Sequence, residues 1–328
     1  MSSSLKMDRK AFLKRSGLAG GLLMTSELIP KNMGVKSVRF GIITDLHFDL
    51  MHDGADRMRA FINSMKKESP EFIIQGGDFC VPKKENQVLM NIWNEFSGPK
   101  HHVLGNHDTD GGYSKEQVLK FWNAEGRYYS FDLKDYHFVI LDGNEHNEDP
   151  NRPKGYARYI SPKQVEWLKA DLSSTNLPTV VFCHQGMDND AGGLENGTLL
   201  RYTLENSNKN GGSKVILVIS GHHHQDYHNI INGIHYLQIN SASYQWLGEE
   251  YQEIRYSAEV DKSFPWLKNT VPYKDPIWAI IEINSKGEIM VQGRHTVFVG
   301  SSPEQLGVDM HQFIYPIVPY ISDRKIKF

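Results

Sequence analysis

The sequence predicts an α/β fold in which two packed β-sheets are flanked by helices, and three observations lead to that prediction. The first half of the chain alternates short β-rich runs with segments of helical periodicity. The later part is dominated by β-rich runs, which favours a second sheet over a single parallel one. Apolar residues make up 39% of the 328 residues and charged residues 23%, values typical of a folded globular chain rather than a disordered or fibrous one.

The first elements alternate strictly between strand and helix. Val38–Ile43 is a short β-rich run and is expected to form a buried strand. The segment 53–68 follows it with apolar residues at i, i+3, i+4 and i+7, which is the spacing of an amphipathic helix. The same reasoning gives strands at 71–75 and 101–104 and helices at 85–96 and 114–124.

The middle and later elements are mostly strands. Residues 128–133 and 136–141 are expected to pair as a hairpin. Ser161 followed by Pro162 predicts a helix start, with the serine as the cap and the proline in the first turn. The remaining β-rich runs are 179–183, 214–220, 234–239, 278–283 and 288–292. Residues 244–276 form an aromatic and charged insertion that is too long for an ordinary connection.

Residues 1–36 differ in composition from the rest of the chain. A basic start is followed by a short apolar stretch at 17–24, which is the pattern of an export signal. The segment 8–14 resembles a bacterial twin-arginine signal, although it has Arg9-Lys10 where two arginines are usual. We therefore expect an exported, periplasmic protein, with a cytoplasmic protein whose N-terminus is an amphipathic helix as the alternative. The expected organisation is 1–36 signal or disordered N-terminus, 37–300 domain, and 301–328 C-terminal extension packed on the domain.

Charge, hydropathy and cysteine content exclude several classes of protein. The formal charge of −3 indicates no strong nucleic-acid surface. No run reaches the roughly 18 apolar residues of a membrane-spanning helix. Cys80 and Cys183 are too few for a disulfide framework and are expected to be small packing residues, with redox sensitivity as the alternative.

Five polar motifs each follow a β-rich run. Because ligands of α/β sheets bind beyond the carboxyl ends of strands, these motifs can direct their side chains into one pocket. Carboxylate and imidazole ligands suit Zn, Mn and Fe(II). Each motif alone has a plain structural explanation, such as a turn or a capped strand end, but the ordered set does not. The motifs are Asp45-x-His47, Gly77-Asp78, Gly105-Asn106-His107-Asp108, His184 and Gly221-His222-x-His224.

This ordered set resembles the calcineurin-like metallophosphoesterase family, over residues 38 to about 295. The resemblance implies a double β-sandwich flanked by helices, a four-layer α/β/β/α arrangement. It also implies a catalytic histidine, His107, oriented by Asp108. The implied ligands of the first metal are Asp45, His47, Asp78 and His224, and those of the second are Asp78, Asn106, His184 and His222, with Asp78 as the bridge.

Two positions depart from the family pattern. Val81 stands where many members have an acidic residue or a tyrosine, which argues against the purple acid phosphatase branch. His184 is followed by Gln185-Gly186, where a proline two positions after the histidine is common, and this change is expected to alter the loop without removing the ligand.

Two neighbouring divalent cations, Mn, Zn or Fe, would activate a bridging hydroxide for attack on phosphorus. We therefore expect a hydrolase acting on small phosphorylated substrates, with phosphodiesters favoured because no arginine cluster is visible for a dianionic monoester. A phosphomonoesterase or nucleotidase, and a scaffold with a vestigial metal site, are the alternatives. Asn144, Tyr244 and Trp246 are candidate substrate contacts. Asn144 could equally form a turn, and the aromatic residues, with Trp266, could equally cover a sheet edge.

Overall fold

Two six-stranded sheets form the centre of the computed structural model, which describes residues 36–328 except 190 and 210–213. The first sheet has the order β14-β13-β12-β1-β2-β3, and the second has the order β4-β5-β6-β7-β9-β8. The expected export signal, apart from Lys36, lies outside the described residues. The strands of the first sheet are β1 (Val38–Ile43), β2 (Phe72–Gln75), β3 (Lys100–His102), β12 (Ala279–Asn284), β13 (Glu288–Gln292) and β14 (Arg324–Lys327). Those of the second are β4 (Tyr129–Leu133), β5 (Tyr136–Leu141), β6 (Thr179–Cys183), β7 (Val215–Ser220), β8 (Tyr227–Ile231) and β9 (Ile234–Gln238).

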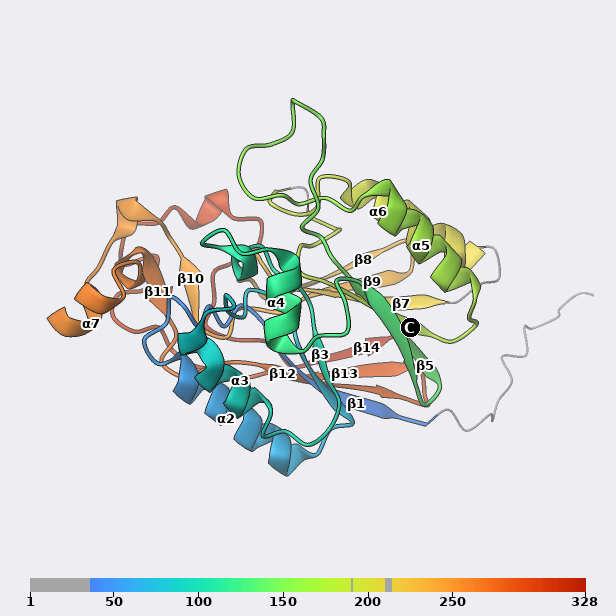
Figure 1. Cartoon of the computed structure of the whole chain (residues 1–328), viewed down its shortest axis with the longest axis horizontal. Coiled ribbons are helices and arrows are strands. Elements are labelled where there is room, and N and C mark those ends of the chain that lie inside the picture. The colour runs from blue at the N-terminus through green and yellow to red at the C-terminus, as the bar shows by residue number, and fades with distance from the viewer. Residues whose placement is uncertain (1–35, 190, 210–213) are drawn as a thin grey trace, which may run out of the picture. The chain divides into compact units, whose positions relative to one another are not determined.

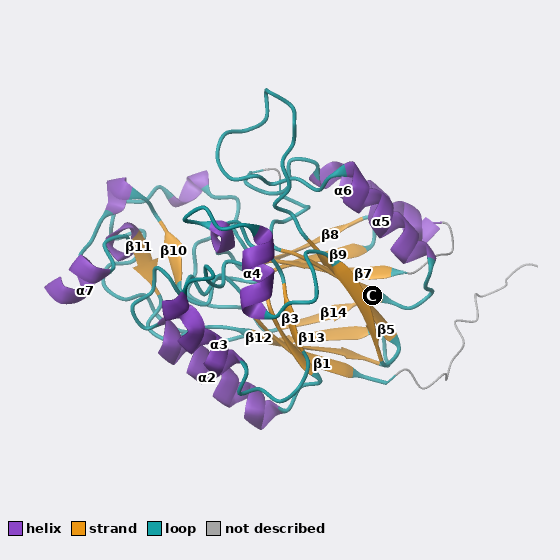
Figure 2. Cartoon of the chain, viewed as in Figure 1, coloured by secondary structure: helices purple, strands orange, loops and turns teal. Residues whose placement is uncertain are grey.

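Helices cover the outer face of each sheet. Figure 1 shows α2 and α3 on one side of the strands and α5 and α6 on the other. Figure 2 shows the same arrangement by element type, with the strands in the middle. The helices are α2 (Gly54–Glu68), α3 (Gln87–Trp93), α4 (Lys115–Trp122), α5 (Pro162–Ser173), α6 (Gly197–Lys209) and α7 (Ala258–Ser263). Within the described residues, no helix is both long enough and apolar enough to cross a membrane.

An aromatic layer joins the two sheets. Phe40 of β1 stacks on Phe72 of β2 with ring centroids 4.8 Å apart, and its ring also lies 5.8 Å from Phe182 of β6 and 6.0 Å from Phe138 of β5. All four rings are fully or almost fully buried. Two further apolar clusters lie beneath the helices, one under α2, α3 and α4 and one under α5 and α6. These layers confirm the predicted double β-sandwich flanked by helices.

The strand and helix predictions hold closely where periodicity and caps were clear. Ser161 accepts a hydrogen bond from the Gln164 amide and caps α5, as expected. The chain also forms α6, β8 and β14, which the sequence patterns did not predict. The insertion 244–276 contains β10 (Tyr244–Trp246), α7 and β11 (Thr270–Pro272), and β10 pairs with β11. In the C-terminal segment, β14 pairs antiparallel with β13, so it completes the first sheet.

Two histidines of β3 and the two cysteines next to the motifs serve packing. His101 stacks on Phe131 with centroids 3.9 Å apart, and His102 stacks on Trp122 at 5.3 Å. Cys80 and Cys183 are buried free thiols, and burial raises the pKa of both. A buried thiol with a raised pKa has little thiolate, so the geometry favours the packing role expected for both cysteines.

Candidate metal centre

The five polar motifs meet at one edge of the two sheets. β1, β2 and β3 run parallel, as do β6 and β7, so the loops after their carboxyl ends lie together. The Asp45 amide donates to the Gly77 carbonyl at 2.9 Å, and the His47 amide to the Asp78 carbonyl at 2.9 Å. The His222 amide donates to both carboxylate oxygens of Asp45 at 3.1 Å, which links the loop after β7 to the loop after β1. Loops from both sheets therefore build the same site.

The backbone of this site is strained where the candidate ligands lie. Asp45, His47, Asp78, His222 and His224 all have φ between 48° and 73°, the left-handed region that residues with a Cβ seldom adopt. Nine described residues other than glycine have positive φ, and these five are among them. Because such conformations are unfavourable, their concentration at one place indicates a functional requirement.

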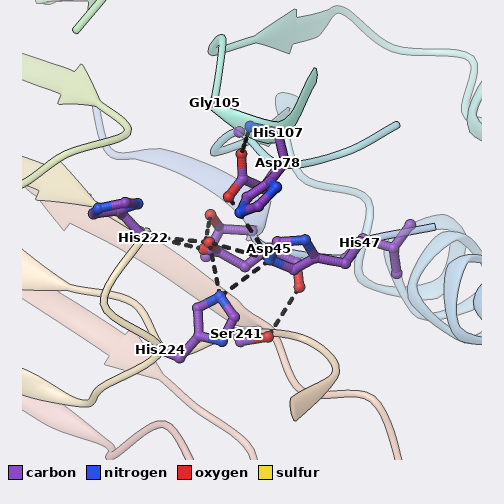
Figure 3. A network of polar contacts seen from close by, with 12 residues as sticks. Asp45, His47, Asp78, Gly105, His107, His222, His224 and Ser241 are labelled. Atoms are coloured by element: carbon purple, nitrogen blue, oxygen red, sulfur yellow. Dashed lines mark hydrogen bonds and ion pairs between the residues drawn. The ribbon is translucent and has the colours of Figure 1, made fainter. Parts of the chain in front are cut away.

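The first cluster consists of Asp45, His47 and His224, whose side chains point toward one another (Figure 3). Asp45 Oδ1 lies 3.2 Å from His224 Nε2, and the His47 and His224 Nε2 atoms lie 3.1 Å apart. Two ligand atoms that are each about 2.0–2.2 Å from one cation are separated by about 3–3.6 Å. The three side chains therefore have the spacing of a shared metal ion.

The second cluster consists of Asp78, His184 and His222. His184 Nε2 lies 3.1 Å from Asp78 Oδ2. The other ring nitrogen, Nδ1, lies 2.8 Å from the Gly76 carbonyl oxygen, which fixes Nδ1 as the donor and leaves Nε2 as the nitrogen that faces the cluster. Asn106 Oδ1 is buried and has no hydrogen-bond partner in the described part of the chain. A buried oxygen without a partner is unfavourable unless a ligand satisfies it, which fits the metal-binding role expected for Asn106.

One oxygen of Asp78 reaches both clusters. Asp78 Oδ2 lies 3.7 Å from His47 Nε2 in the first cluster and 3.1 Å from His184 Nε2 in the second. Asp78 Oδ1 instead accepts a hydrogen bond from the His107 amide at 2.8 Å. This places Oδ2 between the clusters, the position that a carboxylate shared by two cations requires.

The protonation states of four of the ligands also suit cations. Burial raises the pKa of Asp45, but His184 and His224 outweigh it and hold the pKa below its usual range. Burial likewise acts against ionisation of Asp78, yet neighbouring histidines, His184 first, hold its pKa well below normal. Burial lowers the pKa of His47 to about 3, and of His222 well below normal, so both rings are neutral at pH 7. Burial also lowers the pKa of His184, but Asp78 and Asp45 outweigh burial and raise it to about 10, so a bound cation would replace the proton on Nε2. Ionised carboxylates and neutral imidazoles are the forms that bind metal.

The histidine expected to be catalytic, His107, lies beside Asp78 (Figure 3). Burial lowers its pKa, but Asp78 and Asp110 together outweigh burial and raise the pKa to about 9. Its Nδ1 atom lies 2.7 Å from Asp110 Oδ2. Both carboxylates therefore favour the form of the ring that is protonated on both nitrogens.

The expectation that Asp108 orients His107 is wrong, because the Asp108 carboxylate points elsewhere. Its Oδ1 accepts hydrogen bonds from the amides of Phe79 and Cys80 at 2.7 and 3.1 Å. Its Oδ2 accepts from the amides of Gly105 and Asp78 at 2.7 and 3.1 Å. Asp108 is fully buried and joins the loop after β2 to the loop after β3. Asp110 is the carboxylate that contacts the His107 ring.

A cavity of about 670 Å³ opens over the metal ligands. Tyr244 and Trp246 both line it, together with Trp266 from the same insertion and Val81. Tyr244 is buried, and its ring lies 4.9 and 5.1 Å from the rings of His47 and His224, so it supports the ligands from the side. Trp246 and Trp266 are 43% and 57% exposed, which leaves their faces available to a bound molecule.

Asn144 lies outside this cavity, on the wall of a neighbouring one of about 630 Å³ that also includes Asn106. Its side-chain amide donates to the Leu104 carbonyl at 2.8 Å, and its side-chain oxygen accepts from Gln185 at 2.6 Å. The side chain of Asn144 is thus occupied in joining loops.

Sequence reasoning missed Asp110 and Tyr156. Asp110 lies two residues after the Gly-Asn-His-Asp motif, so proximity to that motif was an available signal. Tyr156 belongs to the long connection between β5 and α5, and its hydroxyl donates to Asp110 Oδ1 at 3.0 Å. Nothing in the local sequence pattern marks it.

Comparisons with known proteins agree with the geometry. The family model of the calcineurin-like phosphoesterases matches residues 38–226. A manganese-dependent ADP-ribose/CDP-alcohol diphosphatase from Arabidopsis thaliana is 25% identical, and the match covers 62% of this chain and 85% of that protein. A dimetal phosphatase from Danio rerio superposes with a TM-score of 0.59 at 16% identity, covering 81% of this chain and 99% of the other. GAP50, the anchor in the inner membrane complex of Plasmodium, superposes with a TM-score of 0.51 at 17% identity, covering 81% and 86%. The two structural likenesses show a shared fold.

Proposed function

This chain belongs to the calcineurin-like phosphoesterase family, and from that premise we propose that it hydrolyses the diphosphate bridge of nucleotide-linked small molecules. The chain is a hydrolase of phosphoric ester bonds that uses two divalent metal ions. The observation that carries the proposal is the pair of His/Asp clusters joined by Asp78 Oδ2 at the floor of an aromatic cavity.

Seven side chains would hold the two ions. Divalent cations bound here would supply positive charge to phosphoryl oxygens and lower the pKa of water toward neutrality. Hydrogen bonds from the backbone to Asp108 and Asp45 connect the loops that carry these donors. The proposed ligands are Asp45, His47 and His224 for one ion, Asn106, His184 and His222 for the other, and Asp78 for both.

His107 would donate a proton to the leaving group. Its Nδ1 atom is engaged by Asp110, which leaves Nε2 as the nitrogen for transfer. The two carboxylates raise the pKa of His107 despite its burial, which favours the protonated ring that a general acid needs. General acid catalysis of this kind contributes about 10²–10⁴-fold to rate.

The substrate class follows from the cavity and the charge of the site. Each phosphorus of a doubly substituted diphosphate carries a single negative charge, as a phosphodiester does. The described residues lining the larger cavity include no arginine or lysine for a dianionic phosphate. The exposed faces of Trp246 and Trp266 provide stacking surfaces for a base, and base–aromatic stacking contributes about 1–3 kcal/mol. The relative named for ADP-ribose and CDP-alcohols supports the same class, with manganese as the metal.

The test compares matched nucleotides on the manganese-loaded protein. ADP-ribose and CDP-choline present a doubly substituted diphosphate, whereas AMP and CMP present the same bases with a terminal monoester. We expect kcat/KM for the diphosphates to exceed that for the monoesters by at least about tenfold, a difference of about 1.4 kcal/mol in transition-state binding. A preference for AMP and CMP would overturn the proposal in favour of a nucleotidase. Absence of turnover on all four, with both metals bound, would favour a scaffold.

A further inference from the structure

We propose that Asp110 and Tyr156 are positioning residues that hold the His107 ring so that Nε2 presents its proton to the leaving group. This inference rests on the proposed function. Asp110 Oδ2 lies 2.7 Å from His107 Nδ1, and the Tyr156 hydroxyl donates to Asp110 Oδ1 at 3.0 Å. The same hydroxyl oxygen lies 3.3 Å from His107 Nδ1. Three side chains thus form a closed triangle of polar contacts on one edge of the imidazole.

The fold holds both positioning residues in place. Asp110 follows the short 3-10 turn His107–Thr109, and its amide donates to the His107 carbonyl at 3.1 Å. Tyr156 comes from a long connection, but Arg152 donates to the Tyr156 carbonyl at 2.9 Å. Arg152 in turn pairs with Glu195 at 3.1 Å, and Glu195 is almost fully buried. The Tyr156 backbone is therefore anchored to the second sheet's side of the molecule.

The contacts determine which proton His107 can transfer. A carboxylate that accepts from Nδ1 fixes the ring orientation and keeps Nδ1 protonated, as in the triads of hydrolases. When the bond between phosphorus and the leaving oxygen breaks, the electron pair stays on that oxygen, which takes the proton from Nε2. His107 is then neutral, with its Nδ1 proton still bonded to Asp110, and regains a proton from solvent.

Tyr156 adds a second constraint. Its ring lies 4.7 Å from the His107 ring at a tilt of 57°, so it limits rotation of the imidazole toward solvent. It also lines both cavities beside the metal centre. A substrate that spans the centre would contact Tyr156, which couples substrate position to the orientation of the proton donor.

The first experiment detects the hydrogen bond between His107 Nδ1 and Asp110 by proton NMR and does not depend on turnover. In the protein loaded with diamagnetic zinc, the Nδ1 proton bonded to a carboxylate should give a downfield imidazole resonance that His107→Gln removes. We expect Asp110→Asn to abolish or shift that resonance and Tyr156→Phe to broaden it. Asp149→Asn is the matched control, since Asp149 only caps the turn at Asn151 in the same connection. A His107 resonance at unchanged chemical shift in Asp110→Asn, or its absence from the wild type, would overturn the proposal.

The second experiment measures how much the contact between Asp110 and His107 contributes to protonation of the leaving group. Thymidine 5′-monophosphate phenyl ester and its p-nitrophenyl analogue share charge and base, but the phenol needs far more help from an acid. We expect Asp110→Asn to lower kcat about tenfold on the phenyl ester and less than about threefold on the nitrophenyl ester, with KM unchanged. In a His107→Ala background the same substitution should have no further effect, because it acts through the ring.

The outcomes separate this inference from the proposed function. Equal loss of kcat on both esters, at full metal content, would overturn the positioning role while leaving the proposed function intact. Wild-type protein that hydrolyses neither ester nor any diphosphate would overturn the proposed function, and the resonance experiment would still decide the contact. If Asp110→Asn does not fold, Tyr156→Phe gives the same selective loss at a smaller size. Tyr128→Phe is its control, because the Tyr128 ring contacts Trp167 and Arg127 rather than His107.

Discussion

Replacing Asp108 with asparagine tests whether this carboxylate stabilises the loop backbone or orients the His107 ring. Each Asp108 oxygen accepts two backbone amides, from Phe79 and Cys80 at Oδ1 and from Gly105 and Asp78 at Oδ2. The asparagine side chain retains one acceptor oxygen, and its amino group faces the other two donors. Each buried amide left without a partner costs about 1–3 kcal/mol, so the expected loss of unfolding free energy is about 2–6 kcal/mol. That is a large part of the 5–15 kcal/mol that stabilises a typical domain.

The assay is urea unfolding at fixed metal concentration, together with metal content measured by elemental analysis. Since the disrupted loops carry Asp78 and Asn106, we expect metal content to fall along with stability. Asp110→Asn is the matched control, because the Asp110 side chain is 43% exposed and should keep both properties. An Asp108→Asn protein with unchanged unfolding free energy and full metal, but reduced turnover, would refute this reasoning and restore Asp108 as a partner of His107.

Five further substitutions test other parts of the structure. Asp78→Asn should reduce occupancy at both metal positions in elemental analysis, because one oxygen serves both clusters; loss of a single equivalent would contradict the bridge. Gly105→Ala should lower metal content similarly, because the added Cβ would lie 2.2 Å from the Asp78 amide nitrogen and Oδ1. Trp246→Ala and Trp266→Ala should raise KM for ADP-ribose by about fivefold or more with kcat little changed, if either ring stacks on the base. His137 of β5 lies 2.6 Å from Asp132 and 2.9 Å from Asp171. Burial lowers the pKa of His137, but these two carboxylates outweigh burial and raise it. The stabilisation from the protonated ring is therefore full below about pH 6.5 and is lost as pH rises through the folded-state pKa. We expect His137→Gln to destabilise the protein more at pH 5.5 than at pH 9 in urea unfolding.

How far the sequence could predict the fold depended on local signals. Strands such as β1 and β5 are short apolar runs with clear boundaries, and α5 has both a serine cap and a proline in its first turn. By contrast β14 is Arg-Lys-Ile-Lys, which buries only Ile326 and has no pattern of its own. It forms because β13 has backbone N–H and C=O groups available for pairing at its edge. The cause therefore lies in the tertiary structure and not in the local sequence. The apolar positions of α6 are interrupted by polar residues, so its helical periodicity was not recognised in the sequence.

For the site, the residue types and their place after strands were sufficient to predict which side chains would meet. They were not sufficient to predict which other side chains would contact the His107 ring. Asp108 and Asp110 are both acidic residues close to His107 in sequence, and only the 3-10 turn after Asn106 decides which carboxylate reaches the ring. Tyr156 arrives from 49 residues away along a connection without periodicity. Long-range contacts of this kind depend on loop geometry, which a single sequence does not specify.

The metal centre is also a junction between the two sheets, and this has a consequence for stability. His222 from the second sheet donates its amide to Asp45 of the first, while His184 approaches both Asp45 and Asp78. Five residues there hold left-handed backbone conformations that cost of order 1–3 kcal/mol each, and two ionised carboxylates are buried among them. Cations that neutralise those charges would favour the strained conformation over the unfolded chain. The same loops that position the metals therefore depend on them, and metal binding and the packing of one sheet against the other should be thermodynamically coupled.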